Sequence, residues 1–555
     1  MTASFLPAML SPLAFLTPAV LSAQNPYLPM WEYIPDGEPY VFDEPDCPGR
    51  QRVYIYGSHD TMVNGYCGRE LVTWSASTDS LTSWRYDGII LEVKTNALGE
   101  YLDKEQKGDV FYAPDVAERV AADGKKMYYL YPNNQCGGRN GMVAVSERPD
   151  GPFRVINWCE ENPSATVGDL GFDPAVFIDD DGKVYGYWGF GEAYMAELDP
   201  NTMATVKPGA KVLHNYISGY KQDGPFRFYE ASSMRKIKDK YVLIYSRVTA
   251  DGEFGLPSSN YTLAYAYGNH PTGPFTYGGT IIDARSRGVD DAGKTVATAV
   301  PYGNTHGSIC MINGRWWVFF HRQTGTDEYS RQAMVAPIEI EVTEGENGKI
   351  VISEAEYTSE GFMTEGLNPF VRHSAGIASY LTAPKPAIHE WPNNTFFGSY
   401  VKPLRLDTIP RTKPYDISVN HNPVVNNTSG SVAGYKYFNL DKSYGARQLA
   451  LNVTIEPKGI DGEIDVYIDS PYTSLGGTKV GTLAIRHDMP QQKQGIFTDV
   501  TPISRFNGKH ALFFVFRSET EGKSLCDLHD FVLYSSTKSN TPPATSCSPA
   551  RHQKE

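Results

Sequence analysis

The sequence predicts an all-β protein in which a five-bladed β-propeller is followed by a β-sandwich domain. Five aromatic-rich, strand-like runs recur 57 to 75 residues apart, a spacing that suits propeller blades of about four short strands. The 36 Tyr, 51 Gly and 38 Pro favour short strands joined by tight turns. Helical periodicity is scarce between the runs, so we expect few helices.

The chain begins with 23 uncharged, mostly apolar residues that contain prolines and end in Ser22 and Ala23. This segment is typical of a secretory signal peptide, although a positively charged start is missing. No later segment approaches 18 consecutive apolar residues, so we expect no membrane partner. Five N-glycosylation acceptor motifs agree with a secreted, extracellular protein, at Asn260, Asn393, Asn426, Asn427 and Asn452.

The charge and the cysteine pattern of the chain argue against several classes of function. The formal net charge is −14, with no basic stripe, which argues against a nucleic-acid partner. The seven cysteines include no CxxC pair, so neither a structural zinc site nor a thioredoxin-type motif is expected. In an oxidising compartment, two pairs are candidate disulfides, Cys47 with Cys67 and Cys136 with Cys159.

Each aromatic run follows a polar turn, as the second strand of a hairpin does. Closing five such units into a ring would hide the strand edges that an open sheet leaves exposed. We therefore assign residues 24–365 to the propeller. The five runs begin at Val53, Met127, Val184, Tyr241 and Trp316.

The strand before each aromatic run begins with a polar or ionisable residue. In a propeller the first strand of every blade lines the central channel, so these residues converge on the axis. Clustered carboxylates shift one another's pKa values, and without a metal-ligand pattern they suit glycoside hydrolysis. We interpret Asp115 as structural and the others as candidate site residues. The five residues are Asp36, Asp115, Asp173, Glu230 and His306.

The motifs PDGEPYVF, APDV, FDPAVFIDDDGKVYGYWG, FYEASSMRKIKDKYVLIYS and THGSI…WWVFFHRQ occur in this order. Together they resemble glycoside hydrolase family 43 over roughly residues 25–357, which implies a five-bladed propeller and an inverting mechanism. The resemblance implies that Asp36 is the general base and Glu230 the general acid. It also implies that Asp173 orients the acid and keeps its pKa raised. Glu38 is a rival for the base, because the usual Asp-Pro is replaced by Asp36-Gly37-Glu38 here.

Further site residues follow from the same resemblance. Arg322, in FFHR, matches an arginine that contacts the sugar. His306 matches an axial histidine near which family members hold calcium or another ion with water. We expect no cofactor for catalysis, so any ion on the propeller axis would be structural. Tyr112 and Trp188 are additional candidates for substrate binding.

The regular spacing of aromatic-rich runs ends near residue 365. We interpret residues 366–395 as a connector and residues 396–537 as an antiparallel β-sandwich, because segments such as EIDVYID alternate with period two. The last strands of this region resemble family 6 carbohydrate-binding modules. Such a domain either binds glycan or forms one side of the active-site pocket, and both alternatives stay open. Residues 538–555, rich in Ser, Thr and Pro, are predicted to be a disordered tail.

The resemblance leaves the substrate open among α-L-arabinofuranosides, β-D-galactofuranosides and β-D-xylosides. We expect a secreted inverting exo-glycosidase that removes non-reducing α-L-arabinofuranosyl residues from plant cell-wall polysaccharide. The first alternative is a β-D-galactofuranosidase acting on fungal-type glycans, followed by a β-D-xylosidase. A non-catalytic sugar-binding propeller is the alternative from a different class. The expected partner is a glycan, and the expected state is a monomer.

Overall fold

The computed structural model describes residues 24–102, 110–121, 123–134, 139–300, 302–406, 415–416 and 418–535. The predicted signal peptide, Cys136 and the predicted tail lie outside these residues. Within them, no helix has the length and apolar character needed to cross a bilayer. The helices of the described residues are short 3₁₀ turns: η1 (Glu253–Gly255), η2 (Ala375–Ile377), η3 (Thr473–Leu475) and η4 (Thr501–Arg505).

Five antiparallel sheets follow one another along the chain, and within each sheet the strands pair in sequence order. Two hairpins, β17–β18 (Arg287–Val289, Thr295–Ala297) and β22–β23 (Ile340–Val342, Ile350–Ile352), flank the fifth sheet in sequence. The sheets are β1–β4 (Glu38–Asp43, Gln51–Tyr56, Glu70–Ser77, Arg85–Glu92), β5–β8 (Tyr112–Val120, Lys126–Asn133, Ala144–Ser146, Arg154–Val155), β9–β12 (Ala175–Ile178, Val184–Trp188, Tyr194–Leu198, Leu213–His214), β13–β16 (Phe228–Ile237, Lys240–Arg247, Thr262–Gly268, Thr276–Asp283) and β19–β21 (Ser308–Ile312, Arg315–Arg322, Gln332–Ile338).

The predicted strand order within these units is confirmed. Every aromatic run is the second strand of its sheet, namely β2, β6, β10, β14 and β20. The strand that precedes each run, and that carries or follows the polar residue, is the first strand of the sheet. The register that aligns the candidate site residues is therefore a property of the fold.

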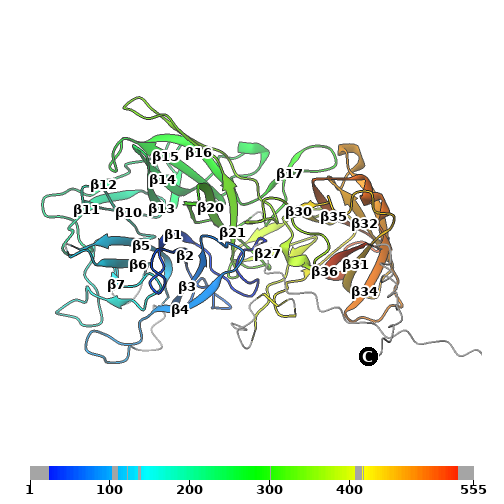
Figure 1. Cartoon of the computed structure of the whole chain (residues 1–555), viewed down its shortest axis with the longest axis horizontal. Coiled ribbons are helices and arrows are strands. Elements are labelled where there is room, and N and C mark those ends of the chain that lie inside the picture. The colour runs from blue at the N-terminus through cyan, green and yellow to red at the C-terminus, as the bar shows by residue number, and fades with distance from the viewer. Residues whose placement is uncertain are drawn as a thin grey trace, which may run out of the picture.

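The five sheets close into a ring. A buried apolar cluster lies between each pair of neighbouring sheets, and one of them joins Ile55 of the first sheet to Trp317 of the fifth. Gly37 forms a parallel bridge with Gly307, which links the first and fifth sheets directly. The backbone N–H of Tyr27 donates to Ala333 O of β21, beside the three-stranded fifth sheet. The ring is the predicted five-bladed propeller, drawn from blue to green in Figure 1.

The C-terminal strands form two packed sheets around one apolar core, as predicted for a β-sandwich (Figure 1). Residues 366–395, predicted to be a connector, also contribute strands, because β24 pairs with β36 and β25 pairs with β30. One sheet contains β24 (His373–Ser374), β28 (Tyr400–Val401), β29 (Val424–Val425), β31 (Leu449–Pro457), β34 (Gln494–Asp499) and β36 (Cys526–Ser535), and the other contains β25 (Tyr380–Thr382), β30 (Val432–Asn439), β32 (Gly462–Ile468), β33 (Thr478–Ile485) and β35 (Lys509–Arg517).

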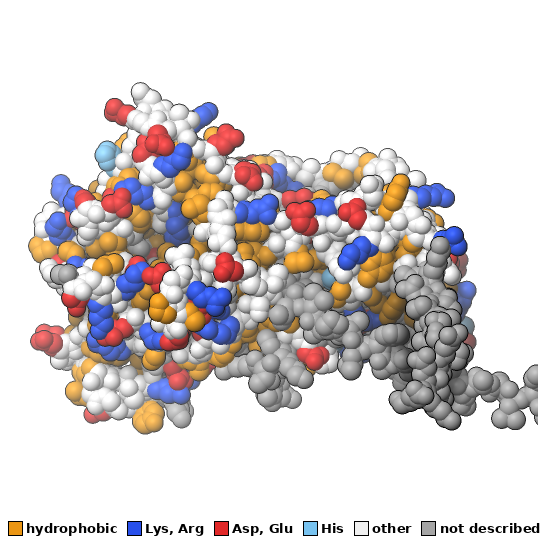
Figure 2. Space-filling model, in the orientation of Figure 1, with side chains coloured by type: hydrophobic (Ala, Val, Ile, Leu, Met, Phe, Trp, Pro, Cys, Tyr) orange, Lys and Arg blue, Asp and Glu red, His pale blue; other side chains and the backbone are white. Residues whose placement is uncertain are grey.

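Two surface properties bear on the sequence-based expectations. On the described residues of the face in Figure 2, acidic and basic side chains are interspersed, and no continuous basic surface suited to a phosphate backbone is seen. Cys47, Cys67 and Cys159 are free thiols. The candidate disulfide between Cys47 and Cys67 is therefore absent, and Cys67 is instead buried.

Candidate active site

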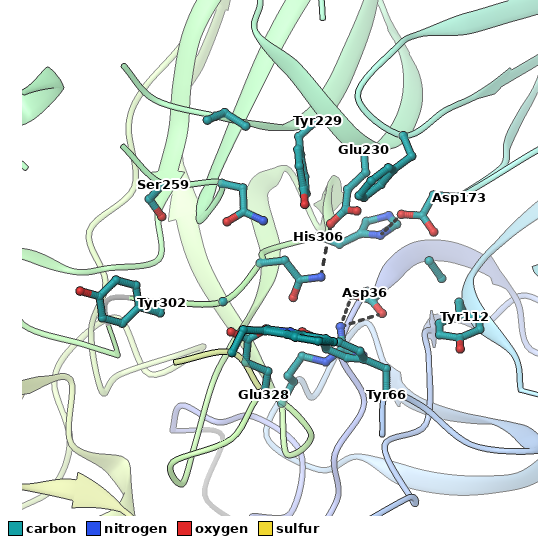
Figure 3. Close-up of a pocket in the computed structure, with 18 of the residues that line it drawn as sticks. Asp36, Tyr66, Tyr112, Asp173, Tyr229, Glu230, Ser259, Tyr302, His306 and Glu328 are labelled. Atoms are coloured by element: carbon teal, nitrogen blue, oxygen red, sulfur yellow. Dashed lines mark hydrogen bonds and ion pairs between the residues drawn. The ribbon is translucent and has the colours of Figure 1, made fainter. Parts of the chain in front are cut away.

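A cavity of about 870 Å³ opens among the blades, and it is lined by Tyr112 and by four of the predicted ionisable residues, Asp36, Asp173, Glu230 and His306. Each of these four ionisable residues is at most 5% exposed. Figure 3 shows Glu230, Asp173 and His306 grouped together, with Asp36 facing the same pocket. The convergence predicted from blade register is thus what the fold produces.

The backbone is irregular at each of the three carboxyl residues. Asp36 precedes β1 with φ of 60°, and Asp173 precedes β9 with φ of 47°. Glu230 lies within β13, where the register with β14 shifts on both sides of it. Positive φ and strand bulges re-aim side chains and cluster at functional sites, where surrounding packing holds the strain. The local backbone therefore turns all three carboxyl groups toward one cavity.

Asp36 is surrounded by groups that favour its ionised form. The Ser58 hydroxyl donates to Asp36 Oδ2 at 2.6 Å, and Arg331 Nη1 lies 3.1 Å and 3.2 Å from the two carboxylate oxygens. Burial is the largest single effect and opposes ionisation, but the Arg331 guanidinium and the neighbouring polar groups together outweigh it, so the pKa of Asp36 lies below its ordinary value. Asp36 is a carboxylate at neutral pH.

Glu230 has the opposite electrostatic environment. Burial, followed by the negative charge of Asp36, raises the pKa of Glu230 to about 7. Its polar contact is with Asn304, whose Nδ2 donates to Glu230 Oε1 at 3.3 Å. A large share of Glu230 is therefore protonated near neutral pH.

Asp173 is the third carboxyl group of the cavity. Burial and then the charges of Glu230 and Asp36 raise the pKa of Asp173 well above its ordinary value, against a 3.1 Å hydrogen bond from Asn133 Nδ2. Because an ionised Glu230 disfavours a second charge on Asp173, Asp173 retains its proton more strongly than an isolated carboxyl group would.

His306 lies between Asp173 and a deeper carboxyl group. Its Nδ1 is 3.8 Å from Asp173 Oδ2, and its Nε2 is 3.9 Å from Glu38 Oε1, a buried oxygen without a hydrogen-bond partner. Burial lowers the pKa of His306 to about 4, so the imidazole is neutral. Across the described residues, no group of three or more His, Cys, Asp and Glu side chains could hold a metal. These residues do not fit a calcium ion caged by protein oxygens, since calcium takes six to eight oxygen ligands.

Glu38 does not reach the cavity. Its carboxylate forms a 2.7 Å ion pair with Arg235 and accepts from the Ser233 hydroxyl at 3.0 Å. Glu38 is absent from the cavity lining, which contains Asp36. Geometry thus favours Asp36 over its sequence rival.

The prediction that Arg322 contacts the sugar is wrong. Its guanidinium is buried and bonds Gln332 Oε1, Ala378 O and, by a short contact, Gly376 O. Arg322 therefore joins the fifth blade to η2. The preceding residue, His321, faces the site instead, because neighbouring residues on a strand point to opposite sides.

The two aromatic residues predicted to bind substrate, Tyr112 and Trp188, lie in different places. Tyr112 lines the cavity and lies beside Asp36 in Figure 3. Trp188 does not, so its predicted substrate contact is wrong. Its ring stacks on Tyr194, with centroids 6.0 Å apart and planes 9° apart, and belongs to the buried cluster between the second and third blades. A Cβ at Gly171 would lie 2.6 Å from the Trp188 ring, which shows how closely this indole is packed.

Sequence reasoning missed the residues that hold the carboxyl groups in place. Arg331 ion-pairs with both Asp36 and Asp60. The backbone N–H of Asp36 donates to His321 Nδ1 at 3.2 Å, so the His321 proton resides on Nε2, which donates to Asn304 O at 2.8 Å. The charge of Arg331 and the position of His321 in FFHR were the available signals.

The cavity thus contains an ionised carboxylate, a protonated carboxyl group and a third acid, as acid–base hydrolysis of an acetal requires.

Residues 47–344 match the family described as glycosyl hydrolases family 43. A xylosidase/arabinosidase of Thermoclostridium stercorarium is 30% identical, covering 92% of this chain and 98% of its own. An arabinoxylan arabinofuranohydrolase of Bacillus subtilis (strain 168) is 25% identical, over 85% and 86% of the two chains. A solved family 43 arabinoxylan arabinofuranohydrolase from Bacillus subtilis, in complex with cellotetraose, has a TM-score of 0.44 at 22% identity, covering 93% of this chain and 98% of that chain.

Proposed function

Because this chain belongs to glycosyl hydrolase family 43, we propose that it is an inverting exo-glycosidase that removes terminal α-L-arabinofuranosyl residues from plant cell-wall polysaccharide. The names of the two curated relatives, a xylosidase/arabinosidase and an arabinoxylan arabinofuranohydrolase, support this substrate class. Polysaccharide of this kind is extracellular, which fits export of the chain by the segment 1–23.

In the proposed reaction Asp36 is the general base and Glu230 the general acid. Asp36 takes a proton from a water molecule, whose oxygen attacks the anomeric carbon from the face opposite the leaving group. Glu230 gives its proton to the glycosidic oxygen as the bond to the anomeric carbon breaks. The products are a free sugar of inverted configuration and a shortened chain, with Asp36 protonated and Glu230 ionised.

The other cavity residues prepare this step. Asp173 is proposed to orient the acid, burial and the charge of Asp36 keep the acid protonated, and Arg331 keeps the base ionised. Tyr112 and Arg331 are the proposed sugar contacts, the latter in place of Arg322. His306, neutral beside Asp173, is proposed as a positioning residue; an ion there would need water for most of its ligands.

The observation that carries the proposal is the opposite shift of two acids facing one cavity: a lowered pKa for Asp36 and a pKa of about 7 for Glu230. The test is turnover of nitrophenyl α-L-arabinofuranoside, β-D-galactofuranoside and β-D-xyloside beside arabinoxylan. Asp36→Asn should lower turnover of every cleaved substrate by about 10²–10⁴-fold. Glu230→Gln should lower arabinoxylan turnover similarly but spare nitrophenyl substrates, whose leaving group needs no proton.

Glu38→Gln is the matched control, because Glu38 is a buried carboxyl group of the same blade that does not line the cavity. Equal loss from Glu38→Gln and Asp36→Asn would contradict the assignment of the base. A second activity, β-D-xyloside hydrolysis, is favoured by the name of the Thermoclostridium relative and is read from the same panel. Binding without product from any substrate would support a sugar-binding propeller instead.

A further inference from the structure

One wall of the catalytic cavity comes from outside the family-matched residues 47–344. The hairpin β26–β27 (Ile388–Glu390, Asn393–Thr395) lies beyond them, yet His389 and Trp391 line the cavity. In Figure 1, β27 lies between the propeller and the sandwich. The hairpin is therefore part of the pocket although it is no part of a blade.

The hairpin is fixed to the propeller by polar and aromatic contacts. Asn394 N–H donates to Thr326 O at 2.6 Å, and the Tyr302 hydroxyl donates to Ala387 O at 3.1 Å. The rings of Tyr302 and His389 stack at 4.6 Å with planes 16° apart. These contacts place the tip of the hairpin at a defined position on the pocket wall.

Trp391 is positioned but not covered. Its side chain interacts with Tyr66, which lines the same cavity. The Tyr66 hydroxyl donates to Glu328 by a short contact, and the Tyr66 ring lies 5.0 Å from the Arg331 guanidinium that holds Asp36. Despite this anchoring, Trp391 is 63% exposed. A large aromatic ring that is fixed at one end and open to a pocket is suited to contact a ligand rather than to pack a core.

The cavity has room for more than the terminal sugar. Its volume of about 870 Å³ is near the upper end of the 300–1,000 Å³ typical of pockets for drug-sized ligands. Figure 3 shows Tyr302 at the opposite side of the view from Asp173. Substrate bound between Asp36 and Glu230 would therefore leave the hairpin side of the cavity free for the chain to which the sugar is attached.

We propose that the hairpin supplies the leaving-group subsite, in which Trp391, beside the stacked Tyr302–His389 pair, packs against an uncharged pyranose ring of the polysaccharide backbone. The inference rests on the proposed function and adds the residue that distinguishes a polymer from a simple glycoside. The apolar C–H face of a pyranose is complementary to an indole face. A rival surface exists in Phe190, 54% exposed and in contact with Phe172 and Tyr229 on another part of the pocket.

The test compares wild type with Trp391→Ala in three measurements. The first is kcat/KM on an arabinoxylo-oligosaccharide, and the second is inhibition of that reaction by the product L-arabinose. The third is the affinity for xylotetraose, a ligand that represents the polysaccharide backbone, measured by calorimetry. Trp391→Ala should lower kcat/KM on the oligosaccharide about tenfold, mainly through KM, and weaken xylotetraose binding similarly. L-arabinose inhibition should not change, because this sugar occupies only the terminal site. Trp391→Phe should retain most of the affinity, and Tyr101→Ala, at a 79% exposed aromatic that does not line the cavity, should leave both measurements unchanged.

An unchanged kcat/KM and xylotetraose affinity in Trp391→Ala would overturn the inference, as would a loss confined to Phe190→Ala. An equal loss of L-arabinose affinity would also overturn it, by placing Trp391 in the terminal site. Failure of the proposed function is recognised separately, because wild type would then release no sugar from any nitrophenyl glycoside. Xylotetraose binding by wild type and Trp391→Ala would still test the subsite.

Discussion

At the scale of single residues, the opposite ionisation of Asp36 and Glu230 predicts the pH profile. Glu230 must be protonated to act, and burial and the charge of Asp36 raise its pKa to about 7, so kcat/KM should fall as pH rises through about 7. Asp36 must be ionised, and its lowered pKa predicts that activity persists at least to pH 4. Wild type should show this alkaline limb with arabinoxylan but not with a nitrophenyl substrate, whose leaving group needs no proton, and the residual arabinoxylan activity of Glu230→Gln should lack the limb. A limb that persists in this variant would have another origin.

The raised pKa of Glu230 also predicts that Glu230→Gln, which removes the general acid, makes the folded protein more stable at alkaline pH. The pKa of Glu230 is raised from 4.5 to about 7, so the folded state binds more protons than the unfolded state between these values. The stabilisation from the protonated form is complete below pH 4.5 and is lost as pH rises through 7. At pH 8, Glu230→Gln should therefore raise the free energy of unfolding by about 1–3 kcal/mol, measured by thermal or chemical denaturation. At pH 4 the two proteins should differ little; an equal gain at both pH values would contradict this origin.

The limits of sequence reasoning are clearest at Arg322 and His321. The motif FFHR is visible in the sequence, but which of its last two residues faces the propeller axis depends on the alternation of side chains along the strand, which the motif alone does not fix. The structure turns His321 toward Asp36 and Arg322 toward η2. Arg331, nine residues after the motif, could not be identified from the sequence because its role depends on the pairing of β20 with β21.

At the scale of elements, Arg322 is predicted to matter for stability rather than for sugar binding. It is 3% exposed, and its loss would leave the carbonyls of Gly376 and Ala378 and the Gln332 amide oxygen without this donor. Arg322→Ala should lower the free energy of unfolding by about 2–4 kcal/mol, measured by denaturation. KM for a nitrophenyl glycoside should stay within about twofold of wild type, since no binding energy beyond ~0.4 kcal/mol is removed.

Lys183→Ala is the surface control for that experiment. Lys183 ion-pairs with Asp181 at 2.6 Å, both side chains are about half exposed, and such pairs contribute about 0–1 kcal/mol. A large rise in KM for Arg322→Ala without loss of stability would restore the original sequence prediction of a sugar contact.

Elements also show why the first strands were predictable and the hairpin was not. Asp36, Asp173, Glu230 and His306 hold one register position, before or within the first strand of a blade, and blades repeat in the sequence. The position of each residue relative to the strands of its own blade is set by nearby sequence, so it can be predicted from the spacing along the chain. The hairpin containing Trp391 has no counterpart among the blades, and its place at the pocket depends on long-range contacts such as Asn394 N–H to Thr326 O.

At the scale of the whole molecule, the propeller and the sandwich share buried contacts. Met30, from the segment that precedes the first blade, belongs to the sandwich core, and its N–H donates to Asn420 Oδ1 at 2.6 Å. The Tyr33 hydroxyl donates to Leu404 O at 2.9 Å. Together with Arg322, these contacts mean that the blade ring is completed at one side by residues of the C-terminal region.

This coupling predicts that the propeller does not tolerate removal of the sandwich. A chain ending at residue 365 would expose Met30 and leave the Arg322 guanidinium without two carbonyl partners. Each buried donor left unpaired costs about 1–3 kcal/mol, and marginal domains rarely absorb several such losses. We expect the truncated chain to aggregate or to melt well below the full chain in calorimetry, whereas the full chain melts in one transition. A control ending at Ser535 removes no described residue and should melt like the full chain; a soluble 365-residue chain with an unchanged melting temperature would show that the two parts are independent.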